Sequence, residues 1–224
     1  MKLLHWILDI LFPRKCALCR KLLSKEETDY CRDCRAKAPR FPVLQEKEHP
    51  SGKSTLQFLD SVTAVWYYKE NVREAILRLK FHKAAFLAEP LGRSLAMKVM
   101  ETHPEGFDLL TWVPVSAKRK RKRGYDQAEL LAKAAGKELG IPAQSLLQKI
   151  RDNPAQSGMS GEERKTNVQG VYKMKKGADP SEKRILLIDD VFTTGATAEA
   201  CARVLLSAGA KEVHCAVVAT SQKD

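Results

Sequence analysis

The chain has 224 residues, of which 44% are hydrophobic and 29% charged, a composition that excludes a mainly disordered or low-complexity protein. This length suffices for one substantial core and one small module. Its 39 Lys and Arg residues outnumber the 27 Asp and Glu residues. The resulting formal charge of +12 favours polyanionic ligands, whether a pyrophosphate ester, a nucleic acid or an anionic membrane surface.

Residues 1–12 are mostly apolar and include Trp6. Spanning a bilayer takes about twenty apolar residues, and no small-residue cleavage motif of a signal peptide follows this segment. We therefore expect a cytoplasmic protein without a transmembrane span. The segment fits either a short amphipathic helix packed on the rest of the chain or a surface for a protein partner or peripheral membrane contact.

Four cysteines form two C-x2-C pairs close to the N-terminus: Cys16, Cys19, Cys31 and Cys34. Four thiolates with no open position are typical of a structural zinc site. Two disulfides are the alternative, which a reducing cytoplasm disfavours. Basic residues around the cysteines either contact nucleic acid or balance the thiolate charge. The pattern predicts a zinc finger over residues 1–40.

A linker over residues 41–54, with Pro and Gly among charged residues, is expected to lead into a larger domain over residues 55–224. This domain is predicted to begin with a strand at 61–68, rich in Val, Thr, Trp and Tyr. Asn71 is expected to cap a helix over 72–81. A second helix at 86–101 and a buried strand at 109–115 follow.

Six consecutive basic residues come next, in what we expect to be a loop: Lys118, Arg119, Lys120, Arg121, Lys122 and Arg123. Two or three such side chains and a magnesium ion suffice to hold one diphosphate. The surplus charge therefore predicts contact with nucleic acid, with single-stranded DNA as the candidate. A merely solvated basic loop is the alternative.

A helix is predicted from residue 126 or 127 to about 139, because Gly140 and the Ile141-Pro142 pair would end it. A weak strand is predicted at 143–147. Residues 149–172 lack sustained apolar periodicity and contain several Gly and Pro residues, which indicates a connection that ends in a strand. Such a segment suits a lid over a binding site.

Residues 185–197 are the most informative stretch of the chain. The aliphatic run Ile185–Ile188 is too short for a helix and predicts a parallel strand buried on both faces. Asp189 and Asp190 follow it, at the edge of the sheet where open α/β folds bind ligands. A helix over 196–207 and a last buried strand over 212–220 complete the chain.

The turn after the acidic pair offers hydroxyls and backbone N–H groups at a helix N-terminus, which favours a phosphate. Carboxylates repel a phosphate, so Asp189 and Asp190 are expected to bind two vicinal ribose hydroxyls or a magnesium ion instead. Together the two parts predict a site for a ribose 5-phosphate. The alternative is an ordinary turn with a Thr helix cap and solvated Asp residues. Neither a P-loop nor a G-x-G-x-x-G motif is present.

Residues 185–197 resemble the phosphoribosyl-pyrophosphate loop of type I phosphoribosyltransferases, and other segments are similar to the competence protein F (ComF) branch of that superfamily. The supporting residues are Val113, Pro114, Val115 and Ser116, the run 123–132 (RGYDQAELLA), then Arg151, Gln156, Arg164, Asn167 and Val168, and the four cysteines. The resemblance implies an α/β fold, with a mainly parallel sheet flanked by helices and a small N-terminal zinc finger.

The resemblance also implies roles for individual residues. Asp189 and Asp190 would be catalytic, holding the ribose hydroxyls or the magnesium shell, and Arg151 and Arg164 would contact phosphate or sugar from the lid, although they also fit a role of bonding the lid to itself. Lys80 would either line the site or be solvated. The remaining substrate-binding residues are Val191, Phe192, Thr193, Thr194, Gly195, Ala196 and Thr197 for the 5-phosphate, and Pro114, Val115 and Ser116 for the pyrophosphate.

The implied reaction displaces magnesium pyrophosphate from carbon 1 of phosphoribosyl pyrophosphate by an unidentified nucleophile, with structural zinc and magnesium as the metals. Members of the family are associated with uptake of transforming DNA together with a helicase-like translocase, so a role in DNA uptake or processing is expected. A non-catalytic module that binds single-stranded nucleic acid is the main alternative, and a scaffold that binds only protein is a third. Turnover, acceptor and oligomeric state stay open.

Overall fold

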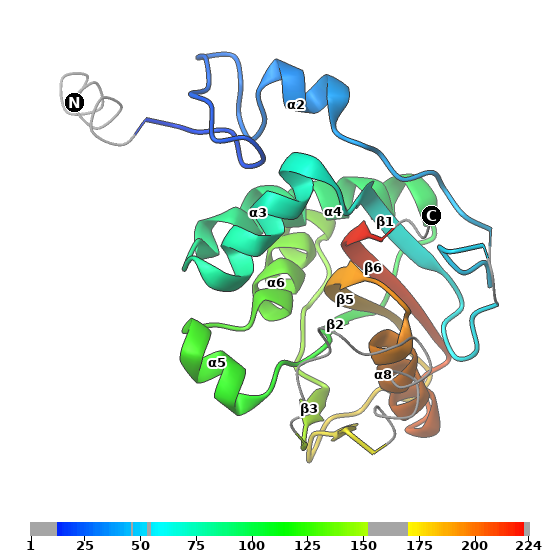
Figure 1. Cartoon of the computed structure of the whole chain (residues 1–224). Coiled ribbons are helices and arrows are strands. Elements are labelled where there is room, and N and C mark those ends of the chain that lie inside the picture. The colour runs from blue at the N-terminus through cyan, green and yellow to red at the C-terminus, as the bar shows by residue number, and fades with distance from the viewer. Residues whose placement is uncertain (1–12, 46, 53–54, 152–169, 222–224) are drawn as a thin grey trace.

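The computed structural model describes residues 13–45, 47–52, 55–151 and 170–221 (Figure 1). The N-terminal apolar segment with Trp6 and the lid candidates Gln156, Arg164 and Asn167 lie outside these residues, so the expectations about them stay predictions. Within the described ranges, every helix is too short or too polar to span a bilayer.

A four-stranded sheet forms the centre of the molecule, in the order β1-β6-β5-β2 (Figure 1). Every neighbouring pair is parallel, which confirms the predicted sheet. Its strands are β1 (Val62–Tyr67), β2 (Leu109–Trp112), β5 (Arg184–Phe192) and β6 (Glu212–Thr220). Successive residues of β5 pack on opposite layers: Leu186 in one core cluster and Leu187 in the other. An aliphatic run without polar alternation is therefore what this central position requires.

Helices cover both faces of the sheet (Figure 1). One layer contains α3 (Glu70–Phe81), the short 3-10 helix η1 (Ala85–Leu87), α4 (Ala88–Thr102) and α6 (Gln127–Leu139). The other contains α8 (Ala196–Ser207) and the antiparallel pair β3 (Leu147–Lys149) and β4 (Tyr172–Met174). Gly92 lets α4 approach α6 closely, because a Cβ there would lie 2.6 Å from the Cβ of Ala134. The bounds of α8 and β6 are those predicted.

The four-cysteine module, with its short helix α2 (Arg32–Lys37), packs on α3 and α4. Arg78 on α3 donates from Nη2 to the carbonyls of Ala17 and Leu18, both at 2.7 Å. On α4, Arg93 Nη1 lies 2.6 Å from the carboxylate of Asp29. Polar contacts thus fix the module to the same helices that cover the sheet.

The segment after this module runs along the outer edge of β1. The Phe41 N–H donates to the Val65 carbonyl at 3.0 Å, and the Tyr67 N–H donates to the Pro39 carbonyl at 2.7 Å. These bonds cover an edge strand that would otherwise offer unpaired backbone groups. The division into residues 1–40, 41–54 and 55–224 stays a prediction.

The predicted loop of six basic residues is wrong, because these residues form the helix α5 (Ala117–Arg123). The Ser116 hydroxyl accepts the Arg119 N–H and caps the helix start. Gly124, with φ of 88°, closes its end in the left-handed region. Lys and Arg are good helix formers, so a run of charge between two caps favours a helix.

The prediction that Asn71 caps the next helix is also wrong. Helix α3 begins two residues earlier than predicted, at Glu70, with Lys69 in the cap position and no side-chain cap bond. Asn71 lies inside α3, where its Nδ2 is 3.9 Å from the Sγ of Cys34. The side chain therefore faces the cysteine module, a long-range contact that local patterns do not reveal.

Strand β5 extends further than its neighbour β2 toward the carboxyl end of the sheet. Pairing with β2 stops at Ile188, whereas β5 stays paired with β6 as far as Phe192. Strand β2 is thus shorter than the predicted 109–115, and β5 is longer than the predicted 185–188. The weak strand expected at 143–147 is displaced toward the C-terminus, because β3 covers Leu147–Lys149. Within the predicted range, Ala143 forms an isolated bridge with Leu110. Asp189 is therefore the first residue of β5 without a ladder partner on β2.

Candidate functional site

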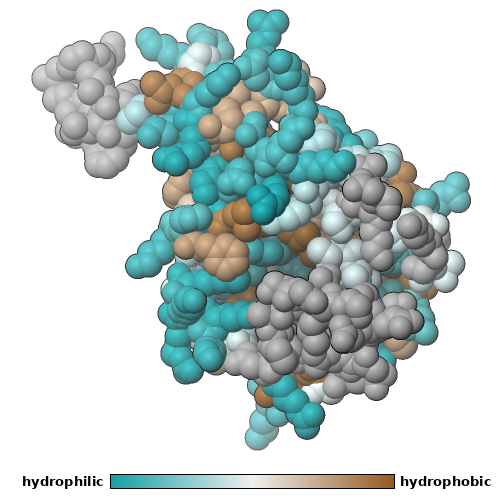
Figure 2. Space-filling view, viewed as in Figure 1, coloured by the Kyte–Doolittle hydropathy of each residue, from teal (hydrophilic) through white to brown (hydrophobic). Residues whose placement is uncertain are grey.

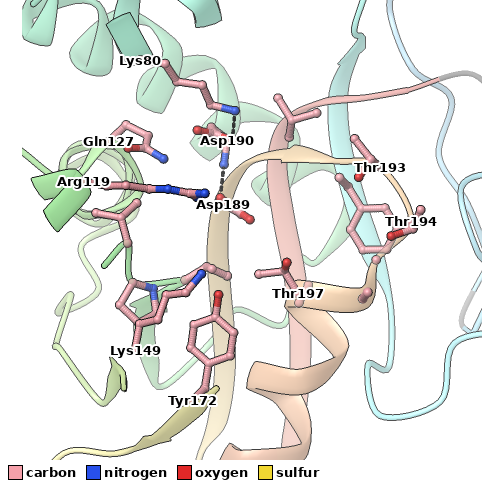
Figure 3. Close-up of a pocket in the computed structure, with 18 of the residues that line it drawn as sticks. Lys80, Arg119, Gln127, Lys149, Tyr172, Asp189, Asp190, Thr193, Thr194 and Thr197 are labelled. Carbon is pink, nitrogen blue, oxygen red and sulfur yellow. Dashed lines mark hydrogen bonds and ion pairs between the residues drawn. The ribbon is translucent and has the colours of Figure 1, made fainter. Parts of the chain in front are cut away.

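A cavity of about 280 Å³ opens at the carboxyl end of the sheet, where β2 stops and β5 continues (Figure 3). The ends of β2 and β5, the turn before α8, the helices α3, α5 and α6, and the β3–β4 pair all contribute to its wall. Its lining residues are Tyr68, Lys80, Val113, Pro114, Val115, Arg119, Arg123, Gln127, Lys149, Tyr172, Asp189, Asp190, Val191, Phe192, Thr193, Thr194, Gly195, Ala196, Thr197 and Ala198.

The two carboxylates of β5 have unequal surroundings (Figure 3). Asp190 is 3% exposed, and its Oδ1 lies 2.8 Å from the ammonium of Lys80 on α3. Its other oxygen, Oδ2, is buried without a hydrogen-bond partner. Asp189 is half-buried, and its Oδ1 accepts the Asp190 N–H at 2.8 Å. The sequence gives the two aspartates the same role, but in the structure only Asp190 forms an ion pair among the described residues.

The charge balance follows from burial and from this ion pair. Burial, and then the neighbouring Asp190, raise the pKa of Asp189 well above its usual value. Burial tends to lower the pKa of Lys80, but the carboxylate of Asp190 outweighs it and raises that pKa. Lys80 is therefore a cation paired with Asp190, whereas in the described residues Asp189 forms no ion pair.

The turn between β5 and α8 requires glycine at its centre. Gly195 has φ of 74°, and a Cβ on it would lie 2.5 Å from the ring of Phe192. Helix α8 begins at the next residue, so the N–H groups of its first turn have no acceptor within the helix. Thr193, Thr194 and Thr197 lie around this turn and the start of α8 (Figure 3). Together with these N–H groups, their hydroxyls are donors that suit an anion at a helix N-terminus.

His49, which the sequence did not single out, supports this turn from the predicted linker. It is buried, its Nε2 lies 3.3 Å from the carbonyl oxygen of Thr194, and its ring centroid lies 5.3 Å from that of Phe192. The contact joins residues far apart in the chain, so no local signal predicts it.

The segment after β2 forms the opposite wall. Pro114 and Val115 line the cavity, and the Val115 N–H donates to Oδ2 of Asp126 at 3.0 Å. The other oxygen of Asp126 accepts the Ala128 N–H and caps α6. Asp126 therefore holds this wall against α6. Ser116 is buried as the cap of α5 and is not among the residues that line the cavity.

Because the basic run is helical, its side chains point in different directions and only some of them reach the cavity. Arg119 and Arg123, one helical turn apart, line the cavity. Lys120 instead lies 2.7 Å from Glu129 on α6. The other three residues of the run, Lys118, Arg121 and Lys122, do not line this cavity. Arg119 is directed toward the acidic pair (Figure 3).

Six lining residues were not among the predicted site residues: Tyr68, Val113, Gln127, Lys149, Tyr172 and Ala198. Lys149 and Tyr172 are a cross-strand pair of β3 and β4, with the Lys149 ammonium 5.4 Å from the centre of the Tyr172 ring. Their only sequence signal is that they border the connection at 149–172. Arg151 is exposed and does not line the cavity, and Arg164 lies outside the described residues.

The four cysteines form the second candidate site. Their Sγ atoms all lie within 4.8 Å of one another, and none forms a disulfide. Burial tends to raise the pKa of Cys16, but backbone hydrogen bonds from Cys19, Cys31 and Leu18 outweigh it and lower the pKa to about 7. Four converging thiols suit zinc, which binds thiolates in a closed tetrahedral shell. This is the predicted structural zinc site.

Comparisons with known families match both parts of the chain. Residues 126–224 match the phosphoribosyl transferase domain, and residues 7–44 match the double zinc ribbon domain. The fold and its two sites therefore define a protein of the phosphoribosyltransferase superfamily with an N-terminal zinc ribbon.

Three curated relatives specify the family. Competence protein F of Haemophilus influenzae is 27% identical over 219 residues, 91% of this chain and 95% of the relative. DNA utilization protein YhgH of Salmonella typhi is 26% identical over 90% of this chain and 95% of its own length. Competence protein ComFC of Streptococcus pneumoniae is 33% identical over 150 residues, which are 67% of this chain and 64% of the relative. The chain belongs to the competence protein F family.

Solved structures similar to this chain include the glutamine phosphoribosylpyrophosphate amidotransferase of B. subtilis, at 25% identity and a TM-score of 0.41. That alignment covers 60% of this chain but only 26% of the amidotransferase. A purine phosphoribosyltransferase from Pyrococcus horikoshii aligns at 21% identity and a TM-score of 0.38, over 59% of this chain and 73% of its own.

Proposed function

We propose that the cavity at the carboxyl end of the sheet binds phosphoribosyl pyrophosphate together with Mg²⁺, and that the protein acts in the uptake or use of DNA. The observation that carries the proposal is a pair of unequal carboxylates facing an anion-binding turn across one cavity. The proteins most informative for the biological setting are named for competence and for DNA utilization.

The 5-phosphate is assigned to the turn of Thr193 to Thr197. Gly195 allows the backbone to curve tightly, and the first turn of α8 offers N–H groups and the positive end of the helix dipole. Hydroxyls of the surrounding Thr residues add further donors. A phosphate is the group that this set of donors recognises best.

The ribose and the metal are assigned to the carboxylates. Among the described residues no ion pair involves Asp189, and Asp190 has a buried oxygen without a partner. Carboxylate oxygens that lack partners fit ribose hydroxyls or Mg²⁺, which prefers oxygen ligands. When bound, Mg²⁺ neutralises negative charge on the diphosphate.

The pyrophosphate is assigned to the cations opposite the turn. Arg119, Arg123 and Lys149 line that wall, and two or three such side chains suffice for a diphosphate. In the reaction we propose, the bond from carbon 1 of the ribose to the pyrophosphate oxygen breaks and a bond to an acceptor nucleophile forms, with pyrophosphate as the leaving group. Stabilising the charge on that leaving group lowers the barrier.

Calorimetric titration with phosphoribosyl pyrophosphate and Mg²⁺ tests the assignment. The D189N/D190N variant should lose about 100-fold in affinity, because two charged hydrogen-bonding groups are neutralised. E105Q/E212Q is the matched control, since it removes two acidic charges at the other end of the sheet and should bind like wild type. Unchanged affinity in D189N/D190N, or an equal loss in the control, would refute the sugar site.

A second candidate is a non-catalytic module that binds single-stranded nucleic acid. It is favoured by the concentration of cations on α5 beside the cavity. Release of pyrophosphate separates the two candidates. If wild type, given phosphoribosyl pyrophosphate, Mg²⁺ and fractionated cell extract, releases pyrophosphate and D189N/D190N does not, the transferase stands; no release from any fraction favours the binding module.

A further inference from the structure

A smaller cavity of about 200 Å³ adjoins the candidate site on the side of α5. We call it the Phe81 groove; its lining residues are Lys80, Phe81, Lys83, Arg119, Lys122 and Arg123. Five of the six are cations and none is acidic. Like charges gathered in one groove repel each other and favour a polyanion that spans them.

Three cations of the groove differ from some other basic residues of the chain because they form no ion pair within the described residues. In the zinc ribbon, Arg14 donates to the carbonyls of Ser24 and Glu27, and Lys21 pairs with Asp33 at 3.0 Å. In the described part of the chain, no acidic side chain forms an ion pair with Lys83, Arg119 or Lys122. Lys83, Arg119 and Lys122 therefore remain available to a ligand of the groove.

An exposed aromatic ring lies among these cations. Phe81 is the last residue of α3 and is 62% exposed, although the guanidinium of Arg123 lies 5.1 Å from its ring centre. The surface over α5 is mainly hydrophilic, with a hydrophobic area toward α3 (Figure 2). Cations that contact phosphates, beside a ring on which a base can stack, are the two elements of a site for single-stranded nucleic acid. In a duplex the bases are stacked on each other and cannot reach such a ring.

We propose that the Phe81 groove binds single-stranded nucleic acid, with one base stacked on Phe81 and phosphates on Arg119 and Lys122. Lys80, Arg119 and Arg123 line both this groove and the candidate sugar site. A strand in the groove therefore uses cations that the pyrophosphate requires. It follows, resting on the proposed function, that the strand and phosphoribosyl pyrophosphate compete.

Fluorescence anisotropy with a labelled oligothymidylate of about 16 nucleotides tests the groove on the full chain. The F81A variant should bind the strand at least fivefold more weakly, since stacking on one aromatic ring contributes about that much or more. F86A is the matched control, because Phe86 is 72% exposed nearby on η1 but does not line the groove. It should bind like wild type.

A second pair of variants separates the groove from general attraction to positive charge. R119Q/K122Q and K118Q/R121Q remove two cations each from α5, but only the first pair lines the groove. R119Q/K122Q should lose clearly more affinity for the strand than K118Q/R121Q. Equal losses, an unaffected F81A, or binding of wild type to phosphatidylserine vesicles but not to the strand would overturn the proposal.

Competition is measured by adding phosphoribosyl pyrophosphate and Mg²⁺ to the complex of protein and strand. Wild type should release the strand, whereas D189N, which leaves the Lys80–Asp190 pair intact, should bind the strand normally and retain it. Simultaneous binding of both ligands by wild type would overturn the shared use of cations. If wild type fails to bind phosphoribosyl pyrophosphate at all, the proposed function and the competition fail together, while the F81A result still decides whether the groove binds the strand.

Discussion

The two ends of the central sheet differ in how completely their polar groups are satisfied. The amino end has the larger cavity, about 540 Å³ against 280 Å³ at the carboxyl end. There His214, 2% exposed, has its Nδ1 2.8 Å from the Ser61 hydroxyl and its Nε2 3.2 Å from Glu212. Arg184 pairs with both Glu105 and Glu212. Charge at this end is locally balanced.

The carboxyl end leaves polar atoms unsatisfied. Asp190 Oδ2 is one of two buried side-chain N or O atoms in the described residues without a hydrogen-bond partner. The other, Arg184 Nε, still lies 2.8 Å from the Glu212 carboxylate. Buried groups without partners are costly, and they are expected where a ligand supplies the partner. The proposed site is therefore assigned to the carboxyl end because of its unsatisfied polar groups and not because of its cavity volume.

The largest expected effect is at the carboxyl end. K80M leaves the buried carboxylate of Asp190 without its cation and should lower the free energy of unfolding by about 3 to 5 kcal/mol. K80M/D190L removes both charges and should be as stable as wild type or more so, by up to about 4 kcal/mol, while losing the sugar ligand. Urea denaturation and calorimetry measure these effects. A stable K80M protein would show that this end holds no buried charge pair.

At the amino end we expect a smaller change in stability and none in binding. R184M removes the partner of Glu105 and Glu212, and also the guanidinium that lies 5.0 Å from the centre of the Phe107 ring. The free energy of unfolding should fall by about 1 to 3 kcal/mol, with unchanged affinity for phosphoribosyl pyrophosphate. A loss of affinity in R184M would mean that the two ends are not separate in function.

The smallest expected effect is a pH dependence at the amino end. Burial, and then the nearby His214, lower the pKa of His103. The folded protein therefore binds fewer protons there than the unfolded chain does. This contribution to stability is present at neutral pH and is lost as the pH falls below about 6.5 and through the folded pKa. Wild type should lose more stability than H103Q between pH 7 and pH 5; parallel denaturation curves would contradict this assignment.

The elements that could be predicted from the sequence have strong local signals. Helix α6 has Asp126 at its start and Gly140 at its end, and the bounds of α8 and β6 match the prediction. The charge of the basic run suggests a loop, although Ser116 and Gly124 are local signals for the two ends of a helix. The turn before α8, and its place after a buried strand, follow from the same kind of signal.

The parts of the site that could not be predicted depend on contacts between distant segments. The difference between Asp189 and Asp190 arises because α3 brings Lys80 to one of them and β2 stops short of both. Lys149 and Tyr172 reach the cavity through the pairing of β3 with β4. None of these relations is encoded in spacing along the chain, since each is set by the packing of the sheet.

A crystal structure of the protein with ribose 5-phosphate and Mg²⁺ tests the central claim most directly. We predict the phosphate on the backbone N–H groups between Thr193 and Thr197, with the ribose hydroxyls or the metal ion on Asp189. A ligand bound at the amino end of the sheet, or a phosphate held away from that turn with Asp189 contacting neither sugar nor metal, would contradict the account.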